Sequence, residues 1–237
     1  MNIAIIGYGK MGKEIEKIAL ERNHKINLIV DEDNISDLNS NNLKNIDVAV
    51  EFTTPEAAVN NIYKCFENNI PVVSGTTGWI DDYDNLINFC KQNNKTFFYA
   101  SNYSIGVNIL FEINSHLAKI MNNFNDYEVL IEETHHIYKL DKPSGTAISL
   151  ANQILENNKN KKGWELETKN KEFLNIKSYR EGEVPGIHKI TYKSDIDKLE
   201  LSHSAFSRKG FARGAVLAAE FIKDKTGVFN MKDLLQF

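Results

Sequence analysis

The sequence has little of what marks a secreted, membrane-bound or metal-binding protein. Only two cysteines occur in 237 residues, and Cys65 and Cys90 lack the close spacing of metal ligands. Each lies in a helical pattern, so we expect small buried side chains rather than a disulfide or a reactive thiol. No apolar run approaches the length that crosses a bilayer. The N-terminus also lacks the basic region and the cleavage site of a signal peptide. We therefore predict a cytoplasmic protein with no membrane segment.

A positive charge excess is also absent, because the formal net charge is -4. This argues against a general nucleic-acid binder, whose affinity would come from a basic surface. An anionic substrate would need a local cationic pocket, since the overall field would not attract it. With 42% hydrophobic and 25% charged residues, the chain has an ordinary globular balance. Its length permits one large domain or two small ones, and no internal repeat is present.

The first hundred residues alternate short apolar runs with longer amphipathic ones. The apolar runs predict strands at residues 3–6, 25–30, 46–52, 71–74 and 96–100. Between the first two, apolar residues at 11, 15, 18 and 19 mark one face of a helix. After Phe52, Thr54 and Pro55 are typical of the start of another helix. This alternation predicts an α/β fold with a Rossmann-like, doubly wound parallel sheet.

The pattern changes after Asn102. Helices are expected at 107–121 and 143–155, with a strand at 127–132. Strands at 173–179, 188–192 and 198–202 then follow without intervening helices, and a last helix covers 214–223. The polar run 157–163 is expected to be a surface loop. Successive strands of this kind predict a second, α+β domain with a mixed or antiparallel sheet.

A glycine-rich turn lies between the first strand and the first helix. Its residues, in G-x-G-x-x-G order, are Gly7, Tyr8, Gly9, Lys10, Met11 and Gly12. Such glycines permit a tight turn and a close approach of backbone to a pyrophosphate at a helix N-terminus. Asp31 ends the second strand, where a carboxylate would accept the ribose hydroxyls. Because Glu32 and Asp33 follow, a 2′-phosphate would be repelled, which favours NADH over NADPH. The alternative is a glycine turn that binds no dinucleotide.

Other turns follow strands at the same predicted edge of the sheet, where ligands of open α/β sheets lie. The residues expected to line a cofactor there are Phe52, Thr53, Gly75, Thr76, Thr77, Ala100, Ser101, Asn102 and Tyr103. Taken singly, each is an ordinary capped turn. A cofactor site is predicted because all of them follow strands at one edge of the sheet.

Two adjacent histidines and a lysine follow the strand that begins at residue 127. His135, His136 and Lys139 place several proton donors in one short segment. Residues 143–146, Pro-Ser-Gly-Thr, then begin a helix whose free N–H groups form an anion site. The segment predicts a site for a small anion that accepts a hydride and then a proton. Adjacent side chains on an extended segment point to opposite sides, so no metal site is expected.

This segment, E-x-H-H-x-x-K-x-D-x-P-S-G-T-A over residues 133–147, closely resembles the signature of the dihydrodipicolinate reductase family. The resemblance extends along nearly the whole chain. It includes the glycine turn, Phe-Thr-Thr-Pro at 52–55, Ser-Gly-Thr-Thr-Gly at 74–78 and Ser-Asn-Tyr-Ser-Ile-Gly-Val-Asn at 101–108. It continues through Arg180-x-Gly182-x-x-x-Gly186-x-His188, Ser-Arg at 207–208 and Arg-Gly-Ala at 213–215.

The resemblance implies reduction of a cyclic dicarboxylate, 4-hydroxy-tetrahydrodipicolinate, to tetrahydrodipicolinate with NADH or NADPH, in lysine and diaminopimelate biosynthesis. By its motif, His135 and Lys139 would be the acid–base pair. Four residues would hold the substrate carboxylates: His136, Ser144, Gly145 and Thr146. The family's organisation further implies a discontinuous dinucleotide-binding domain at 1–103 and 207–237. It also implies a substrate-binding and oligomerisation domain at 104–206, whose sheets pair in a homotetramer.

Two departures from the family pattern bear on the cofactor. The glycine turn is one residue shorter than the family's G-x-x-G-x-x-G, and no basic residue immediately follows Asp31. Two other functions stay open: another Rossmann reductase of small acids, such as an amino-acid dehydrogenase, and a redox-sensing module that binds NAD(H) without turnover. The other reductase does not naturally account for the double histidine and the helix start that follows it, and the redox-sensing module predicts tight cofactor binding without oxidation of NADH.

Overall fold

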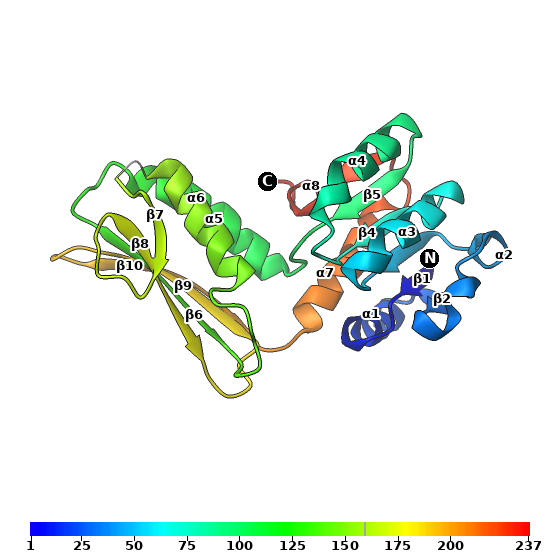
Figure 1. The fold of residues 1–237 in the computed structure, drawn as a ribbon, viewed down its shortest axis with the longest axis horizontal. Coiled ribbons are helices and arrows are strands. Elements are labelled where there is room, and N and C mark those ends of the chain that lie inside the picture. Colours follow the sequence, from blue (N-terminus) through cyan, green and yellow to red (C-terminus); the bar gives the residue numbers. More distant parts are fainter. Residues whose placement is uncertain (159) are drawn as a thin grey trace. The chain divides into compact units, whose positions relative to one another are not determined.

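The structure, a computed structural model, describes residues 1–158 and 160–237 and divides the chain into two compact units (Figure 1). The first comprises Met1–Ile105 and Arg208–Phe237, and the second comprises Gly106–Ser207. The second domain was predicted at 104–206, so its predicted start lies two residues before the start of the second unit, and its predicted end lies one residue before the end of that unit. Each unit has its own sheet and its own hydrophobic core.

The first unit contains a six-stranded sheet in the order β11-β5-β4-β3-β1-β2, and every pair of neighbours is parallel. Its strands are β1 (Asn2–Ile6), β2 (Lys25–Val30), β3 (Val48–Glu51), β4 (Val72–Ser74), β5 (Thr96–Tyr99) and β11 (Gly227–Phe229). The chain proceeds outward from β1 in both directions, so the strand order reverses between β1 and β3. In open α/β sheets a ligand binds outside the strand ends at this point.

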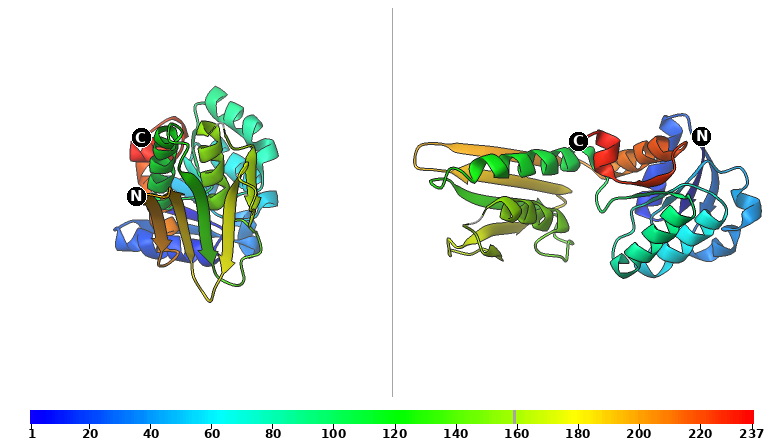
Figure 2. Two further views of the ribbon diagram at one scale, coloured as in Figure 1. Left: turned by 90° about the vertical axis from the view of Figure 1, so that its left-hand side faces the viewer. Right: turned by 90° about the horizontal axis from the view of Figure 1, so that it is seen from above.

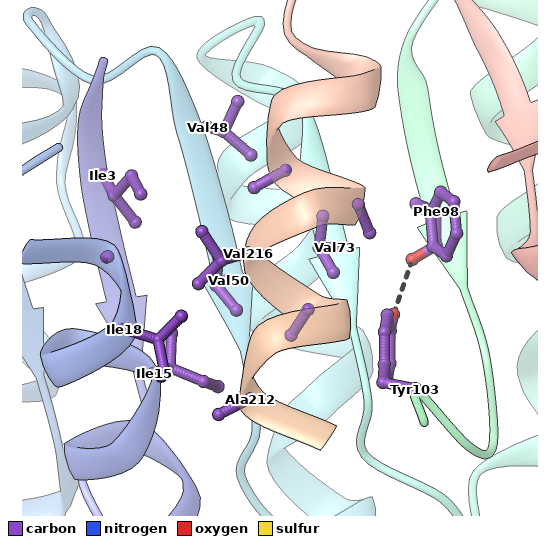
Figure 3. Packing of buried hydrophobic residues seen from close by; sticks show 14 of the residues in the cluster. Ile3, Ile15, Ile18, Val48, Val50, Val73, Phe98, Tyr103, Ala212 and Val216 are labelled. Atoms are coloured by element: carbon purple, nitrogen blue, oxygen red, sulfur yellow. Dashed lines mark hydrogen bonds between the residues drawn. The ribbon is translucent and has the colours of Figure 1, made fainter. Parts of the chain in front are cut away.

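Helices cover both faces of this sheet, as the consecutive apolar residues of its strands require. On one face lie α1 (Lys10–Glu21), α7 (Lys209–Ile222) and α8 (Met231–Leu235). On the other lie α2 (Ser40–Leu43), α3 (Pro55–Glu67) and α4 (Tyr83–Gln92). Ile3 of β1 packs in the cluster with Ile15 of α1 and Val216 of α7 (Figure 3). The next residue, Ala4, packs in the opposite cluster with Ile62 of α3. Two 3-10 turns, η1 (Glu32–Asp37) and η2 (Ile80–Asp82), complete the unit.

The second unit contains a five-stranded mixed sheet in the order β10-β9-β6-β8-β7. Its strands are β6 (Glu128–His135), β7 (Gly163–Leu166), β8 (Phe173–Arg180), β9 (Gly186–Lys193) and β10 (Lys198–Ala205). The pairs β6–β9 and β9–β10 are antiparallel, whereas β6–β8 and β7–β8 are parallel. Two helices, α5 (Ile105–Met121) and α6 (Gly145–Asn157), lie on one face only (Figure 2). Between them and the sheet lies an apolar core around Ile131 and Leu150.

The fold class predicted from the sequence is confirmed, and several element boundaries differ. β6 continues to His135 instead of ending at residue 132. Pro143 lies outside α6, after a cis peptide bond, because Ser144 is the N-cap. The last long helix begins at Lys209 instead of Gly214. β7, β11 and α8 were not predicted.

The predicted loop at 157–163 joins the end of α6 to the start of β7, and Lys159 within it lies outside the described residues. In the part of the chain that the structure describes, no helix is long and apolar enough to cross a membrane.

Candidate functional site

A pocket of about 410 Å³ lies in the first unit, where β1, β2 and β3 end. Gly7, Gly9, Asp31, Phe52 and Thr53, all predicted cofactor residues, line it. The remaining lining residues are Ile6, Val30, Glu32, Ile35, Thr54, Ala57 and Asn61. The position matches the reversal of strand order between β1 and β3, so the topology alone accounts for a cavity here.

The three glycines of the turn have different local reasons to be glycine. Gly7 has φ +92°, and a Cβ there would lie 2.1 Å from the carbonyl oxygen of Phe52. A Cβ on Gly12 would lie 2.2 Å from the carbonyl oxygen of Gly7, so this glycine lets α1 pack closely on the strand. Gly9, the N-cap of α1, faces open space. The turn thus leaves room for a pyrophosphate to approach the backbone at the start of α1, which fits a dinucleotide.

Two acidic residues are among those that line this pocket. Asp31 and Glu32 line it and are exposed. Neither carboxylate has an ion-pair partner within the described residues. Both charges therefore act on whatever occupies the pocket.

Other predicted cofactor residues shape the neighbouring loops instead of lining the pocket. A Cβ on Gly75 would lie 2.2 Å from the Phe52 ring, so the glycine admits that ring. Thr76 is buried, and its hydroxyl accepts from Thr53 N at 2.7 Å. Tyr103 is buried and donates to the carbonyl oxygen of Ser74 at 2.7 Å. The residues that remain partly or fully exposed are Tyr8, Lys10, Met11, Thr77, Ser101 and Asn102, while Ala100 is buried.

A buried carboxylate that the sequence reasoning missed ties these loops together. Glu51, at the end of β3, is fully buried. It accepts hydrogen bonds from Thr53 N at 3.0 Å, Ser74 Oγ at 2.7 Å and Thr76 Oγ1 at 2.9 Å. The signal for it is a lone acid at the end of an apolar strand, followed by two threonines.

The second cluster of polar residues lies in the second unit, at one end of the apolar core. Side chains of a strand alternate between faces, so the alternation that buries Val129 and Ile131 also places Glu133 and His135 on the helix side of β6. The register aligns Glu133 with Ser178 of β8 and with His188 of β9. His135 Nδ1 lies 3.3 Å from Glu133 Oε2. The rings of His135 and His188 lie edge to face, with centroids 5.0 Å apart.

Lys139 lies on the loop after β6, with a side chain 23% exposed. Its Nζ donates to Asp141 Oδ1 at 2.7 Å, and this bond lowers the pKa of Asp141 although burial opposes the shift. Arg180 supports the same loop by donating to the carbonyl oxygen of Lys139 at 3.2 Å and to that of Asp141. His136, next to His135, is only partly buried, and its ring lies 6.2 Å from that of Tyr138.

The start of α6 is the third component of this cluster. Ser144 is buried, and its hydroxyl accepts from Ala147 N at 3.2 Å as the N-cap. Its own backbone N–H donates to Glu133 Oε1 at 3.0 Å. Gly145 is exposed and Thr146 is partly exposed in the first helical turn. A helix start carries a partial positive charge, so an anion is favoured here.

Burial and neighbouring charges set the protonation of the two innermost groups. Burial raises the pKa of Glu133, but contacts with His135, Ser144 and Ser178 outweigh it and hold that pKa well below its usual value. Burial, with the adjacent His135, lowers the pKa of His188 to about 3. At neutral pH the cluster therefore contains an ionised carboxylate beside a neutral His188. Glu133, His135 and His188 also lie close enough together to be compatible with a metal ion.

The structure brings His135, Lys139, Ser144 and the start of α6 into one neighbourhood, and adds Glu133, Ser178 and His188, which were not among the predicted site residues. Glu133 begins the motif at 133–147 and His188 ends the motif at 180–188, whereas Ser178 lies in neither. That the three meet depends on strand register, which the sequence alone did not provide.

Comparison with known proteins gives a consistent result over both units. Residues 1–103 match the family model described as "Dihydrodipicolinate reductase, N-terminus", and residues 106–235 match "Dihydrodipicolinate reductase, C-terminus". A protein of Christiangramia forsetii named 4-hydroxy-tetrahydrodipicolinate reductase is 54% identical over 235 residues, covering 99% of this chain and 98% of its own. A protein of Methanococcus aeolicus with the same name is 37% identical, covering 80% and 71%.

Among solved structures, a dipicolinate-bound dihydrodipicolinate reductase from a Paenisporosarcina species superposes with a TM-score of 0.81. The match covers 98% of each chain at 23% identity. At that identity the likeness shows the fold alone. A probable dehydrogenase from Thermotoga maritima gives a TM-score of 0.56 at 12% identity, covering 100% of this chain and 93% of its own.

Proposed function

The chain belongs to the dihydrodipicolinate reductase family, and on that premise we propose that it reduces 4-hydroxy-tetrahydrodipicolinate to tetrahydrodipicolinate with a nicotinamide cofactor. This reaction belongs to lysine and diaminopimelate biosynthesis. The observation that carries the proposal is the 54% identity, over nearly the full length of both chains, to a reductase of that name. The geometry is consistent with it, because one unit has a pocket beside the glycine turn and the other has a cluster in which His135 and Lys139 lie near the start of α6.

In this proposal the second unit binds the substrate and supplies the proton. Lys139, held by Asp141, supplies the proton, and His135 orients or shares it. His136, Ser144, Gly145 and Thr146 hold the carboxylates at the start of α6. Ser144 supports the carboxylate site by capping α6. Its hydroxyl already accepts from Ala147 N, and its N–H already donates to Glu133. A positioned acid contributes about 10²–10⁴-fold to a rate, so loss of the donor should be measurable.

The first unit holds the cofactor. When bound, the nicotinamide supplies the hydride. The open space at Gly9 admits the pyrophosphate to the start of α1, and Asp31 accepts the ribose hydroxyls. Because neither Asp31 nor Glu32 has an ion-pair partner within the described residues, both oppose a 2′-phosphate, which supports NADH as the preferred cofactor.

One coupled assay tests the proposal. The purified protein is mixed with a synthase that makes the unstable substrate in situ and with NADH or NADPH, and nucleotide oxidation is followed. Oxidation that depends on the synthase is the expected result. Tight nucleotide binding without oxidation would favour a redox-sensing module, and oxidation only with other small acids would favour a different reductase.

We also keep a homotetramer and a cytoplasmic location as predictions. The sheet of the second unit has helices on one face only, and its other face mixes ion pairs such as Glu132–Lys189 with half-exposed side chains such as Tyr179. A face of that composition supports pairing of sheets. Light scattering on the purified protein would measure the mass of the assembly.

A further inference from the structure

The carboxylate of Glu133 occupies the centre of the polar cluster in the second unit. It is fully buried at the end of β6, on the side of the sheet that faces α6. Such a charge is costly unless it is paired and hydrogen-bonded. Here its two oxygens face two different sets of partners, which indicates two separable tasks.

The first oxygen, Oε1, fixes the backbone around the substrate-facing elements. It accepts from Ser144 N at 3.0 Å, directly before α6, and from Ser178 Oγ. Arg180 lies 3.4 Å from it and also donates to the carbonyl oxygens of Lys139 and Asp141. Through these contacts, one oxygen connects the start of α6 with the loop that carries Lys139.

The second oxygen, Oε2, faces the histidines. His135 Nδ1 lies 3.3 Å from it and His188 Nε2 lies 3.8 Å from it. Oε2 and His135 Nδ1 are both buried, and neither has a hydrogen-bond partner among the described residues. Since they lie only 3.3 Å apart, a small rotation of the ring would let them satisfy each other when Nδ1 carries the proton. The Nε2 atom of His135 then remains for chemistry, beside Gly186, where a Cβ would come within 3.1 Å.

We propose that Glu133 is the positioning residue of this site: it holds His135 in the Nδ1–H form and fixes the loop of Lys139 against the start of α6. The inference rests on the proposed function for its kinetic consequence. The structural arrangement is the one by which a buried carboxylate orients a catalytic histidine in other enzymes.

The variant Glu133→Gln separates the two tasks. Its amide oxygen can still accept from Ser144 N and Ser178, so α6 keeps its start. Its amide N–H₂ would then face His135 Nδ1, which must become an acceptor and move its proton to Nε2. We expect kcat to fall about 10²-fold or more, while KM and the Kd for dipicolinate stay within about threefold.

The matched control is Glu132→Gln. Glu132 precedes Glu133 on the same strand, faces the opposite side of the sheet and pairs with Lys189 at 2.6 Å. We expect kcat to stay within about threefold when light scattering shows an unchanged assembly, because a partly exposed ion pair on the face away from the histidines contributes little. Glu133→Asp should recover part of the lost rate, since it restores the charge with a shorter reach. Thermal melting of all variants would test whether they are folded.

The spectroscopic readout is the ring ¹⁵N shifts of His135, assigned with His135→Asn. The parent should show Nδ1–H and Glu133→Gln should show Nε2–H. An unchanged ring tautomer, or a kcat within threefold of the parent, overturns the proposal, as does a stoichiometric metal whose removal by chelator abolishes activity. If the parent shows no turnover with either nucleotide, the proposed function fails, and the tautomer comparison still tests the role of Glu133.

Discussion

The glycine at position 186 controls the space beside His135. A Cβ there would lie 3.1 Å from His135 Nε2. The ring's other nitrogen, Nδ1, lies 3.3 Å from Glu133 Oε2. A Cβ at position 186 would therefore force the ring to shift by a few tenths of an ångström and would change its contact with the carboxylate. Because small misplacements of reacting groups are costly, we expect Gly186→Ala to lower kcat by about 10-fold or more. Steady-state kinetics with the coupled assay measure it.

Gly163→Ala is the control for that substitution. It lies on β7 of the same sheet, and a Cβ there would make an ordinary 3.6 Å contact with Phe173. Its kcat should equal that of the parent. Parental kcat in Gly186→Ala would mean that the position of His135 Nε2 does not limit the reaction.

His188 should make stability depend on pH in a defined window. Its pKa is lowered to about 3, chiefly by burial, so it is neutral in the native state, whereas an unfolded histidine titrates near its ordinary value. Between these values the unfolded chain binds more protons, so stability rises with pH there and is lost as the pH falls. From pH 7 to pH 5 the loss should be about 2 kcal/mol.

Thermal or denaturant unfolding of the parent and of His188→Gln, measured across this range, isolates the effect. The pKa of Glu133 is held well below its usual value, so its stabilisation is lost only under more acidic conditions. His203, whose pKa burial also lowers, is present in both proteins and cancels. Equal slopes for the two proteins would show that His188 is not the neutral, buried group inferred here.

At the scale of elements, Glu51 connects the loops after β3 and β4. Glu51→Ala would leave Ser74 Oγ and Thr76 Oγ1 without this acceptor, whereas Thr53 N could still donate to Thr76 Oγ1. Buried donors without a partner are costly, so we expect a loss of about 2–4 kcal/mol in the free energy of unfolding. Because both loops adjoin the pocket, the Kd for NADH should also rise. Glu67→Ala, at an exposed position at the end of α3, should change neither quantity.

Element prediction succeeded where local patterns were strong and failed where pairing decided the structure. The apolar runs and the glycine turn predicted the parallel sheet, because each signal lies within one segment. β11 has only three residues, and its pairing with β5 brings together positions more than 120 residues apart. β6 was ended too early, because Glu133 and His135 read as polar loop residues. Their place on the strand depends on pairing with β8 and β9.

The same limit applies to the candidate site. The motif marked His135, Lys139 and the start of α6, which are neighbours in sequence. It did not identify Glu133 as their common partner, because that role requires Ser178 and His188 to meet it across the sheet. The sequence can show which side chains are available, whereas register decides which of them share one carboxylate.

At the scale of the whole molecule, a preference for NADH over NADPH has two possible electrostatic causes. One is the net charge of -4, which repels the extra phosphate of NADPH from a distance, and the other is the pair of acids that line the pocket, Asp31 and Glu32. If the local acids decide, Glu32→Arg should raise the NADPH-to-NADH ratio of kcat/KM by about 10-fold, since a guanidinium pairs with a 2′-phosphate.

The salt dependence of KM distinguishes the local acids from the net charge as the cause. Repulsion of the 2′-phosphate is screened as ionic strength rises from about 50 mM to about 300 mM, so the parent's KM for NADPH should fall relative to its KM for NADH. In Glu32→Gln the KM ratio should start lower and depend less on salt, because the adjacent charge is gone. A ratio with the same salt dependence in both proteins would assign the preference to the overall field, since this substitution changes the net charge of -4 by one unit only.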